Sequence, residues 1–235
     1  MTMVSKAADA KEDFDHWKKV RRNYLTSSDM FTWLEVGIPD WWGDTREDIL
    51  HSKVTGEDKE FDTETETSIA HGSYDEEHIQ EKFGYAVGCG VEPHNGLYVN
   101  NRWPYLAASI DGFGFPTPEA ELHPELFQSR AMCKKLRRHI DREGVRFITE
   151  VKKSTSTKWQ REVPEYYITQ VKTQLAIMEI PYAIIMADTV ARGKKMKWRQ
   201  FWDMRAYVIE ADPAWPALLD EIDKEFEDAL DIARR

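Results

Sequence analysis

Residues 105–112 read YLAASIDG and residues 145–152 read VRFITEVK. Each segment is a short apolar run that leads into acidic residues, and such runs are typical of buried β-strands. Side chains alternate between the two faces of a strand, so Glu150 and Lys152 project to one side, about 7 Å apart, while the residue between them turns into the core. With Asp111 on a neighbouring turn, the two segments predict a small pocket that holds two acids and one amine.

The expected ligands in this pocket are all oxygen atoms, from the Asp111 and Glu150 carboxylates and the Val151 carbonyl. Such a set suits Mg²⁺ or Mn²⁺ and not zinc. A cation held by the two acids would lower the pKa of bound water and stabilise the pentavalent transition state of phosphodiester hydrolysis. Lys152 could position that water or bind a phosphate oxygen as a point charge. The pattern therefore indicates a nuclease, although a Glu–Lys pair on a solvated strand face would give the same triplet.

Length and composition fit one domain with a sizeable core, since 41% of the 235 residues are hydrophobic and 12% are aromatic. We therefore expect a single nuclease domain over residues 1–235.

No apolar run approaches the ~20 residues of a membrane span, and the polar segment 1–15 carries no secretory signal. The two cysteines, Cys89 and Cys133, lack metal-binding spacing and are too few for an iron–sulfur cluster. These features favour a cytoplasmic protein in a reducing compartment, with no membrane partner.

The formal net charge of −10 argues against a nucleic-acid partner, because phosphate neutralisation drives such binding. The charge is unevenly distributed, however, with acid concentrated in residues 57–81 and base in residues 130–161 and 192–199. The local field matters more than the total charge for attracting a charged ligand. The basic segments could therefore face DNA, although ordinary solvated faces would show the same clusters.

Hydrophobic periodicity and turn residues divide the chain into helices and strands. Helices are expected at residues 14–24, 30–35, 45–53, 67–83 and 164–178. Strands are expected at residues 96–99, 105–111, 146–152, 181–190 and 197–209. Residues 117–144 are expected to form a charged helical insertion and residues 213–235 a C-terminal helix. This order predicts an α/β or α+β fold with a central mixed β-sheet flanked by helices.

Five short motifs follow one another in an order that is more specific than any one of them. They are Arg21 with Thr26-Ser27-Ser28-Asp29, Gly72-Ser73-Tyr74-Asp75-Glu76, Ser109-Ile110-Asp111-Gly112, Glu150-Val151-Lys152, and Tyr167-Ile168-Thr169-Gln170 followed by Leu175. Together they resemble the YqaJ-type viral recombinase family, the group that includes the exonuclease of bacteriophage lambda, within the PD-(D/E)xK nuclease superfamily. The resemblance runs from Arg21 to Val190 and implies a restriction-endonuclease-like core.

The resemblance assigns an anion-binding role to Arg21 and Ser28. A guanidinium fork and a hydroxyl at a helix N-terminus are similar to a site for a 5′-phosphate or a nearby backbone phosphate. Ser28 could equally serve as a helix N-cap, and the two roles could coexist. Arg22 would take the place of Arg21 if the motif were shifted by one residue.

The resemblance also implies further residues at the active site. Glu76 would approach the metal directly or through water, and Gln170 would contact water or phosphate. Tyr167, one helical turn before Gln170, falls on the same helix face. It would bind DNA near the 5′-phosphate, although packing in an aromatic core would explain it as well.

The chain departs from the family pattern in ways that bear on DNA contact. Ile110 stands where the family usually has a proline, and residues 117–144 lengthen the link between the two catalytic segments. Basic residues of this insertion could contact DNA or a partner, or could only be solvated. Two tryptophans after the arginine–serine motif could stack on a terminal base pair or be buried. These possible DNA contacts are Trp41, Trp42, Lys134, Lys135, Arg137 and Arg138.

The site and the resemblance together predict a Mg²⁺-dependent exonuclease, with two ions and with Mn²⁺ as an alternative, that acts on the ends of double-stranded DNA. The resemblance implies 5′-to-3′ degradation that leaves a 3′ overhang, a single-strand annealing protein as partner and a ring-shaped homotrimer. The setting it implies is a phage-infected or prophage-bearing host cell. Two alternatives stay open. One is another PD-(D/E)xK enzyme, such as an endonuclease or a defence nuclease, and the other is an inactive module that binds DNA ends or a partner.

Overall fold

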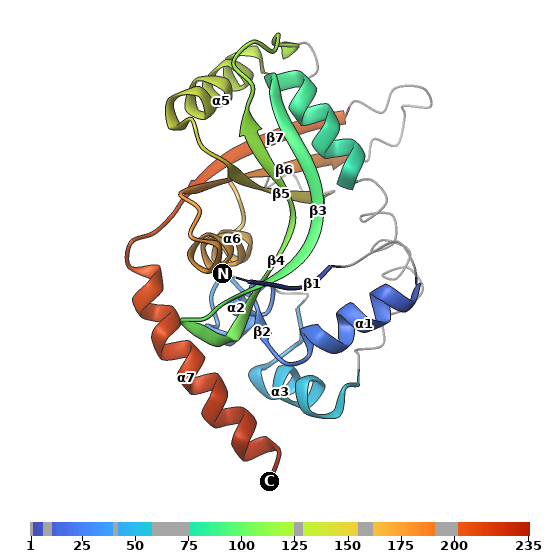
Figure 1. Ribbon diagram of the computed structural model, residues 1–235, viewed down its shortest axis with the longest axis vertical. Helices are drawn as coiled ribbons and strands as arrows, with labels where there is room; N and C mark the ends of the chain where they lie inside the picture. The colour runs from blue at the N-terminus through green and yellow to red at the C-terminus, as the bar shows by residue number, and fades with distance from the viewer. Residues whose placement is uncertain are drawn as a thin grey trace.

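One mixed β-sheet organises the chain in the computed structural model shown in Figure 1. The structure describes residues 2–6, 11–39, 42–57, 76–124, 129–154, 162–190 and 202–235. Within these residues the strands are β1 (Thr2–Lys6), β2 (Leu25–Thr26), β3 (Cys89–Asn100), β4 (Trp103–Pro116), β5 (Phe147–Ser154), β6 (Tyr182–Val190) and β7 (Trp202–Glu210). Their order in the sheet is β1-β3-β4-β5-β6-β7, and β2 pairs with β4. The β5–β6 and β2–β4 pairs are parallel and the others antiparallel, so the sheet is mixed as predicted.

Helices cover both faces of this sheet. They are α1 (Lys11–Arg21), α2 (Met30–Trp33), α3 (Arg46–Thr55), a helix over residues 76–87, α5 (Arg130–Glu143), α6 (Glu165–Met178) and α7 (Trp215–Ala233). One layer of the core holds side chains of α2, α6 and α7, and the other holds side chains of helix 76–87 and α5. Figure 1 shows α5 at the opposite end of the molecule from α3 and α7, with the long β3–β4 hairpin running between the two ends. The predicted α/β class, with a central sheet flanked by helices, is confirmed.

The helix ends follow from local chemistry. Thr45 and Asp48 form a capping box at the start of α3, in which each side chain accepts a hydrogen bond from the other residue's backbone N–H. Gly56 ends the same helix at φ 75°, a left-handed conformation that favours glycine. Ser129 caps the start of α5, since its side chain accepts from the backbone N–H of Met132. These signals are local, which explains why the helices were predicted close to their observed positions.

The strands β3 and β4 are longer than the predicted ranges 96–99 and 105–111. Glycines interrupt the apolar pattern, and glycine is a poor strand former by propensity alone. In the structure these glycines make room for aromatic rings. A Cβ on Gly90 would lie 1.9 Å from the ring of Phe115, and one on Gly114 would lie 2.1 Å from the ring of Phe147. Tertiary packing therefore extends the hairpin beyond what its local sequence indicates.

In the described part of the insertion at residues 117–144, the α-helix is α5. Residues 117–123 are irregular, and the carbonyl oxygens of Thr117, Pro118 and Ala120 accept hydrogen bonds from the Arg137 guanidinium. Those carbonyls are thus satisfied by a side chain and not by a helix. The expectation of helix from residue 117 onward was wrong for this reason.

Several expectations fall on residues that the structure does not describe. The acidic segment 57–81 is described only at its two ends, and helix 67–83 only from residue 76 onward. The motif residues Gly72 to Asp75, the basic segment 192–199 and Trp41 lie outside the described residues. Among the residues that are described, no helix is both long and apolar enough to cross a membrane.

The pairing of β4 with β5 is short. The strands pair at Gly112–Thr149, Phe113–Ile148 and Gly114–Phe147, and the residues of β5 beyond Thr149 pair with β6. Asp111 and Glu150 are the next opposed positions after the last pair. We call this point of separation the fork. A Cβ on Gly112 would lie 2.2 Å from Oε1 of Gln80, so glycine is required for the close approach of helix 76–87 here.

Candidate active site

Asp111 occupies the opening of the fork. Its Oδ2 accepts a hydrogen bond from the backbone N–H of Val151 at 2.7 Å. This bond links β4 to the backbone of β5 one position beyond the last pair of the ladder. The two catalytic segments predicted from the sequence therefore meet in the structure, and they meet where the sheet opens.

Glu150 and Lys152 lie on the same side of β5, as strand alternation predicted. The Lys152 Nζ is 2.6 Å from Oε1 of Glu150, and the two side chains are 18% and 1% exposed. Val151, between them, is 5% exposed and belongs to the core layer of helix 76–87 and α5. The Lys152 Nζ also lies 5.0 Å from the centre of the Tyr167 ring. This burial rules out the alternative of a Glu–Lys pair on a solvated strand face.

Helix α6 contributes two glutamines to Glu150. Gln170 was predicted, and its Nε2 donates to Oε1 of Glu150 at 2.7 Å. Gln174 was not predicted. Its Nε2 donates to Oε2 of Glu150 at 2.8 Å and to the backbone carbonyl of Ser109 at 2.6 Å. Gln174 follows Gln170 by four residues and so lies on the same face of the helix, and this spacing was the feature of the sequence that could have identified it.

Helix 76–87 approaches the fork with Glu76 and Gln80. Gln80, which was also not predicted, donates through Nε2 to the backbone carbonyl of Asp111 at 2.9 Å. Its Oε1 accepts from the Thr149 hydroxyl at 3.0 Å. Glu76 is partly buried one turn earlier, close enough for the charges of Lys152 and Glu150 to act on it.

The electrostatics of the site follow from three carboxyl groups and one lysine. Burial, and then the charge of Glu150, raise the pKa of Asp111 well above its usual range. Burial also raises the pKa of Glu76, although Lys152 opposes this. Burial alone would lower the pKa of Lys152, but the charges of Glu150 and Asp111 outweigh it and raise that pKa. The cluster is therefore short of positive charge.

The donor set fits a divalent cation of the magnesium type. Asp111 and Glu150 supply carboxylate oxygens, and the carbonyl of Val151 belongs to the residue whose N–H already faces Asp111. No three His, Cys, Asp or Glu side chains converge as a complete ion site in the part of the chain that is described. Two carboxylates completed by a main-chain oxygen and water are a common arrangement for Mg²⁺. Glu76 would then act through water.

A second polar cluster lies between α1 and α2, and we call it the anion pocket. The Arg21 guanidinium donates to the hydroxyls of Thr26 at 3.2 Å and of Ser28 at 2.5 Å. Asp29 Oδ2 accepts from Thr26 Oγ1 at 2.8 Å and from Lys53 Nζ at 2.8 Å. Burial would raise the pKa of Asp29, but Lys53 and Arg21 lower it to about 2. Lys53, which comes from α3, was not predicted.

The roles left open for Ser28 and Arg22 are narrowed by these contacts. Asp29, and not Ser28, stands at the N-cap position of α2, and no side chain caps that helix. Ser28 is instead a partner of Arg21. Arg22 lies beside Gly56, where an added Cβ would be 2.9 Å from its Nη1. Arg21 is therefore the arginine of the anion pocket.

Arg137 does not have the surface position that a DNA contact requires. It is 8% exposed, it donates to the carbonyls of Gly88, Thr117, Pro118 and Ala120, and it pairs with Asp141. These bonds give it a structural role, which corrects the prediction for this residue. The neighbouring Lys134, Lys135 and Arg138 are exposed on α5.

Trp42 packs within the protein, which agrees with burial, the second of the two roles expected for it. Its Nε1 donates to the Thr32 hydroxyl at 2.9 Å, and its ring lies 5.0 Å from the ring of Phe31. This side chain is therefore partly buried against α2 and is not a free stacking platform.

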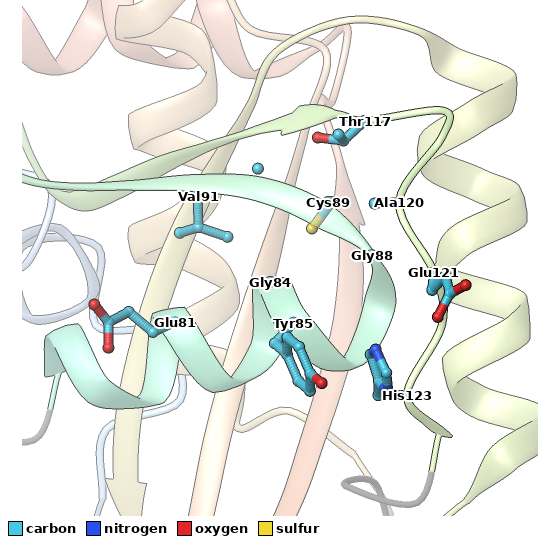
Figure 2. A pocket seen from close by; sticks show the side chains of 11 residues that line it. Glu81, Gly84, Tyr85, Gly88, Cys89, Val91, Thr117, Ala120, Glu121 and His123 are labelled. Carbon is cyan, nitrogen blue, oxygen red and sulfur yellow. The ribbon is translucent and has the colours of Figure 1, made fainter.

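A separate cavity of about 440 Å³ lies between helix 76–87, the start of β3 and the segment after β4 (Figure 2). Figure 2 shows Tyr85 beside His123 at its mouth, and their rings stack with centroids 4.0 Å apart. Cys89 lines the cavity, and burial raises the pKa of its thiol to about 12. None of the lining residues belongs to the acidic cluster at the fork, so this cavity is separate from the fork.

Comparisons with known proteins agree with this geometry. Residues 16–181 match the profile of the YqaJ-like viral recombinase domain. Among solved structures, an alkaline exonuclease from Laribacter hongkongensis (LHK-Exo) is similar with a TM-score of 0.62, 15% identity and 93% of each chain covered. The same enzyme in complex with dAMP gives a TM-score of 0.61. A phage-related exonuclease from Haemophilus somnus 129PT gives a TM-score of 0.53 at 12% identity, over 93% of this chain and 96% of that one. These likenesses establish a shared fold. No curated protein sequence matches the chain.

Proposed function

Since the chain belongs to the family of YqaJ-like viral recombinase domains, we propose that it is a Mg²⁺-dependent exonuclease that degrades double-stranded DNA from its ends. The observation that carries this proposal is the fork, where Asp111, Glu150 and Lys152 converge in one buried cluster. Similarity of fold to exonucleases supports it. A decayed binding module would have no chemical reason to keep two acids and a lysine in contact.

The residues of the fork have separate tasks in hydrolysis. A divalent cation bound by Asp111 and Glu150 would activate water and stabilise the charge that develops on the phosphate. Lys152 remains 18% exposed, so its ammonium can also bind a non-bridging oxygen of the phosphate. Gln170 holds Oε1 of Glu150 and has a second amide proton for water or phosphate. Tyr167 packs against Lys152 and borders the same opening.

The anion pocket supports the proposed 5′-to-3′ polarity. Arg21, with the hydroxyl of Ser28, offers the donors that a terminal phosphate binds. The pocket and the fork lie on packed elements, because Phe31 of α2 contacts Tyr166 of α6 with ring centroids 5.6 Å apart. A duplex whose 5′-phosphate occupied the pocket would therefore present its backbone to the residues of α6 and β5.

Further properties belong to the same proposal and rest on family resemblance. Removal of the 5′ strand would leave a 3′ overhang for a single-strand annealing protein. A ring-shaped homotrimer would keep the enzyme on its DNA between cuts. We propose that the protein uses Mg²⁺, in two sites, and that Mn²⁺ can replace it. It would act in the cytoplasm of a phage-infected or prophage-bearing host.

The test is a time course with Mg²⁺ on linear duplex DNA that is labelled separately at each 5′ and each 3′ end. We expect early release of the 5′ label as mononucleotide, slow loss of the 3′ label and no reaction in EDTA. A covalently closed circle should remain intact. Cleavage of that circle would replace the exonuclease with an endonuclease, and no cleavage of any DNA with Mg²⁺ or Mn²⁺ would leave only a binding module.

A further inference from the structure

At the fork β4 stays paired with β3 on one edge but loses β5 on the other. The carbonyls of Ser109 and Asp111 lie beyond the last pairing with β5, at Gly112–Thr149. A buried carbonyl without a hydrogen bond is destabilising, so such groups are almost always paired. Here two glutamine amides supply the missing donors: Gln174 donates to Ser109 at 2.6 Å, and Gln80 donates to Asp111 at 2.9 Å.

The two glutamines come from opposite layers of the core. Gln174 lies on α6, whose neighbouring residues Val171 and Leu175 pack in one layer. Gln80 follows Ile79 of helix 76–87, which packs in the other layer. The fork is therefore held open from both faces of the sheet.

Gln174 also fixes the Glu150 carboxylate. One amide proton of Gln174 goes to the Ser109 carbonyl and the other to Oε2 of Glu150 at 2.8 Å. Both neighbours are acceptors, so only the NH₂ end of the side chain can face them, and the orientation of the amide is settled by chemistry. The other oxygen of Glu150 is held by Lys152 and Gln170. The carboxylate therefore cannot rotate without breaking a bond.

Stability alone does not explain a glutamine at position 174. The side chain is fully buried, and its Oε1 has no hydrogen-bond partner among the described residues. A buried acceptor without a partner costs about 1–3 kcal/mol. The amide offsets this by binding Ser109 and Glu150, and the second of these bonds also fixes the direction of the carboxylate.

We propose that Gln174 is a positioning residue, which sets the direction of the Glu150 carboxylate and the separation of β4 from β5 so that Asp111 and Glu150 can bind one divalent cation. Gln80 has the matching role for Asp111 and Thr149. The inference rests on the proposed function, since it assigns the fork to a cation. It differs from that function in concerning ion affinity, which can be measured without DNA.

The test is calorimetric titration of the full chain with Mn²⁺, in the absence of DNA, for wild type and Gln174→Met. Methionine keeps the length and volume of the side chain but cannot donate. We expect the affinity for Mn²⁺ to fall 10–100-fold, as it does when a residue that orients a metal ligand is lost. We expect kcat to fall at saturating Mg²⁺ while KM for DNA stays unchanged.

Thr173→Val is the matched control. Thr173 is the adjacent buried residue of α6, and its hydroxyl donates to the Thr169 carbonyl and accepts from Nε1 of Trp215. This variant should lose stability but bind Mn²⁺ like wild type. If Gln174→Met fails to fold, Gln80→Met takes its place in the titration, and we expect the same loss of affinity for Mn²⁺.

Two results would overturn the proposal. One is a Gln174→Met protein with wild-type affinity for Mn²⁺, and the other is a wild-type chain that binds no Mn²⁺. A wild-type chain that binds Mn²⁺ with Gln174-dependent affinity, yet cleaves no DNA, would uphold this proposal and remove the nuclease function. The two hypotheses can thus fail separately.

Discussion

Replacement of Lys152 with methionine separates catalysis from folding. The Lys152–Glu150 pair is 2.6 Å long, with side chains 18% and 1% exposed. Removing one partner of a buried pair typically costs about 3–5 kcal/mol of unfolding free energy. Gln170 and Gln174 would still donate to Glu150, so we expect a loss near 3 kcal/mol, at the lower end of that range.

The same replacement removes the positive charge of Lys152 from the acidic cluster. The expected fall in kcat is about 10²–10³-fold, the size of effect seen when one donor to a developing charge is lost. DNA affinity in EDTA should change little, because most of the Lys152 side chain faces Glu150 and Tyr167. The assays are guanidinium unfolding of the ion-free protein and a Mg²⁺ time course on 5′-labelled duplex.

The pH dependence of the stability loss has a definite sign. The folded-state pKa of Lys152 is raised, so the stabilisation from its charge is complete below its unfolded pKa of about 10.4 and is lost as the pH rises through the folded value. The difference between variant and wild type should therefore be constant through neutral pH and should shrink only in strong alkali.

Lys172→Met is the matched control for this prediction. Lys172 also pairs with a carboxylate, Asp212, at 2.7 Å and lies 5.1 Å from the ring centre of Trp215, but both partners of the pair are more exposed. Its loss should cost about 0–1 kcal/mol and leave cleavage unchanged. The reasoning would be refuted if Lys152→Met cleaved DNA within a few-fold of wild type, or lost no more stability than the control.

Three further predictions concern Asp111, Arg21 and Arg137. Asp111→Asn should abolish cleavage yet stabilise the ion-free protein at neutral pH, because burial and the charge of Glu150 raise the pKa of Asp111 and so disfavour its ionised form in the folded protein. Urea unfolding should show that this gain in stability disappears as the pH falls below about 3.9, where Asp111 is protonated in both the folded and the unfolded wild type. Arg21→Gln should slow digestion of 5′-phosphorylated ends about 10–100-fold, which corresponds to the free energy of one hydrogen bond to a charged group. Equal slowing on 5′-hydroxyl ends would count against phosphate binding in the anion pocket. Arg137→Met should lower the unfolding free energy by at least about 3 kcal/mol, since four carbonyls lose their donor, while the DNA affinity of the folded fraction stays unchanged. Reduced DNA affinity at full stability would instead support the predicted DNA contact of Arg137.

The sequence was sufficient to predict which side chains lie beside Glu150 and Gln170, because these arrangements are local. Strand alternation places Glu150 beside Lys152, and helical spacing places Tyr167 on the face of Gln170. The helix ends were predictable for the same reason, since Thr45 and Asp48 make their capping box within one turn.

The bonds of Gln80 and Gln174 to the β4 backbone were not predictable because they depend on long-range register. Nothing near Gln80 or Gln174 in the sequence marks the point where β4 and β5 separate, although that point decides which carbonyls need a donor. Arg137 shows the same limit. In the basic run of residues 130–142 it is indistinguishable from its neighbours, and only the folded segment after β4 brings four carbonyls to its guanidinium.

The most direct test of the account is anomalous diffraction from crystals of the protein soaked in Mn²⁺. We predict a peak at the fork, within the 2.0–2.6 Å range of ligand distances for such ions, from carboxylate oxygens of both Asp111 and Glu150. A saturating soak that left the fork empty, or that placed Mn²⁺ only at other carboxylates, would contradict the assignment of this cluster as the catalytic centre.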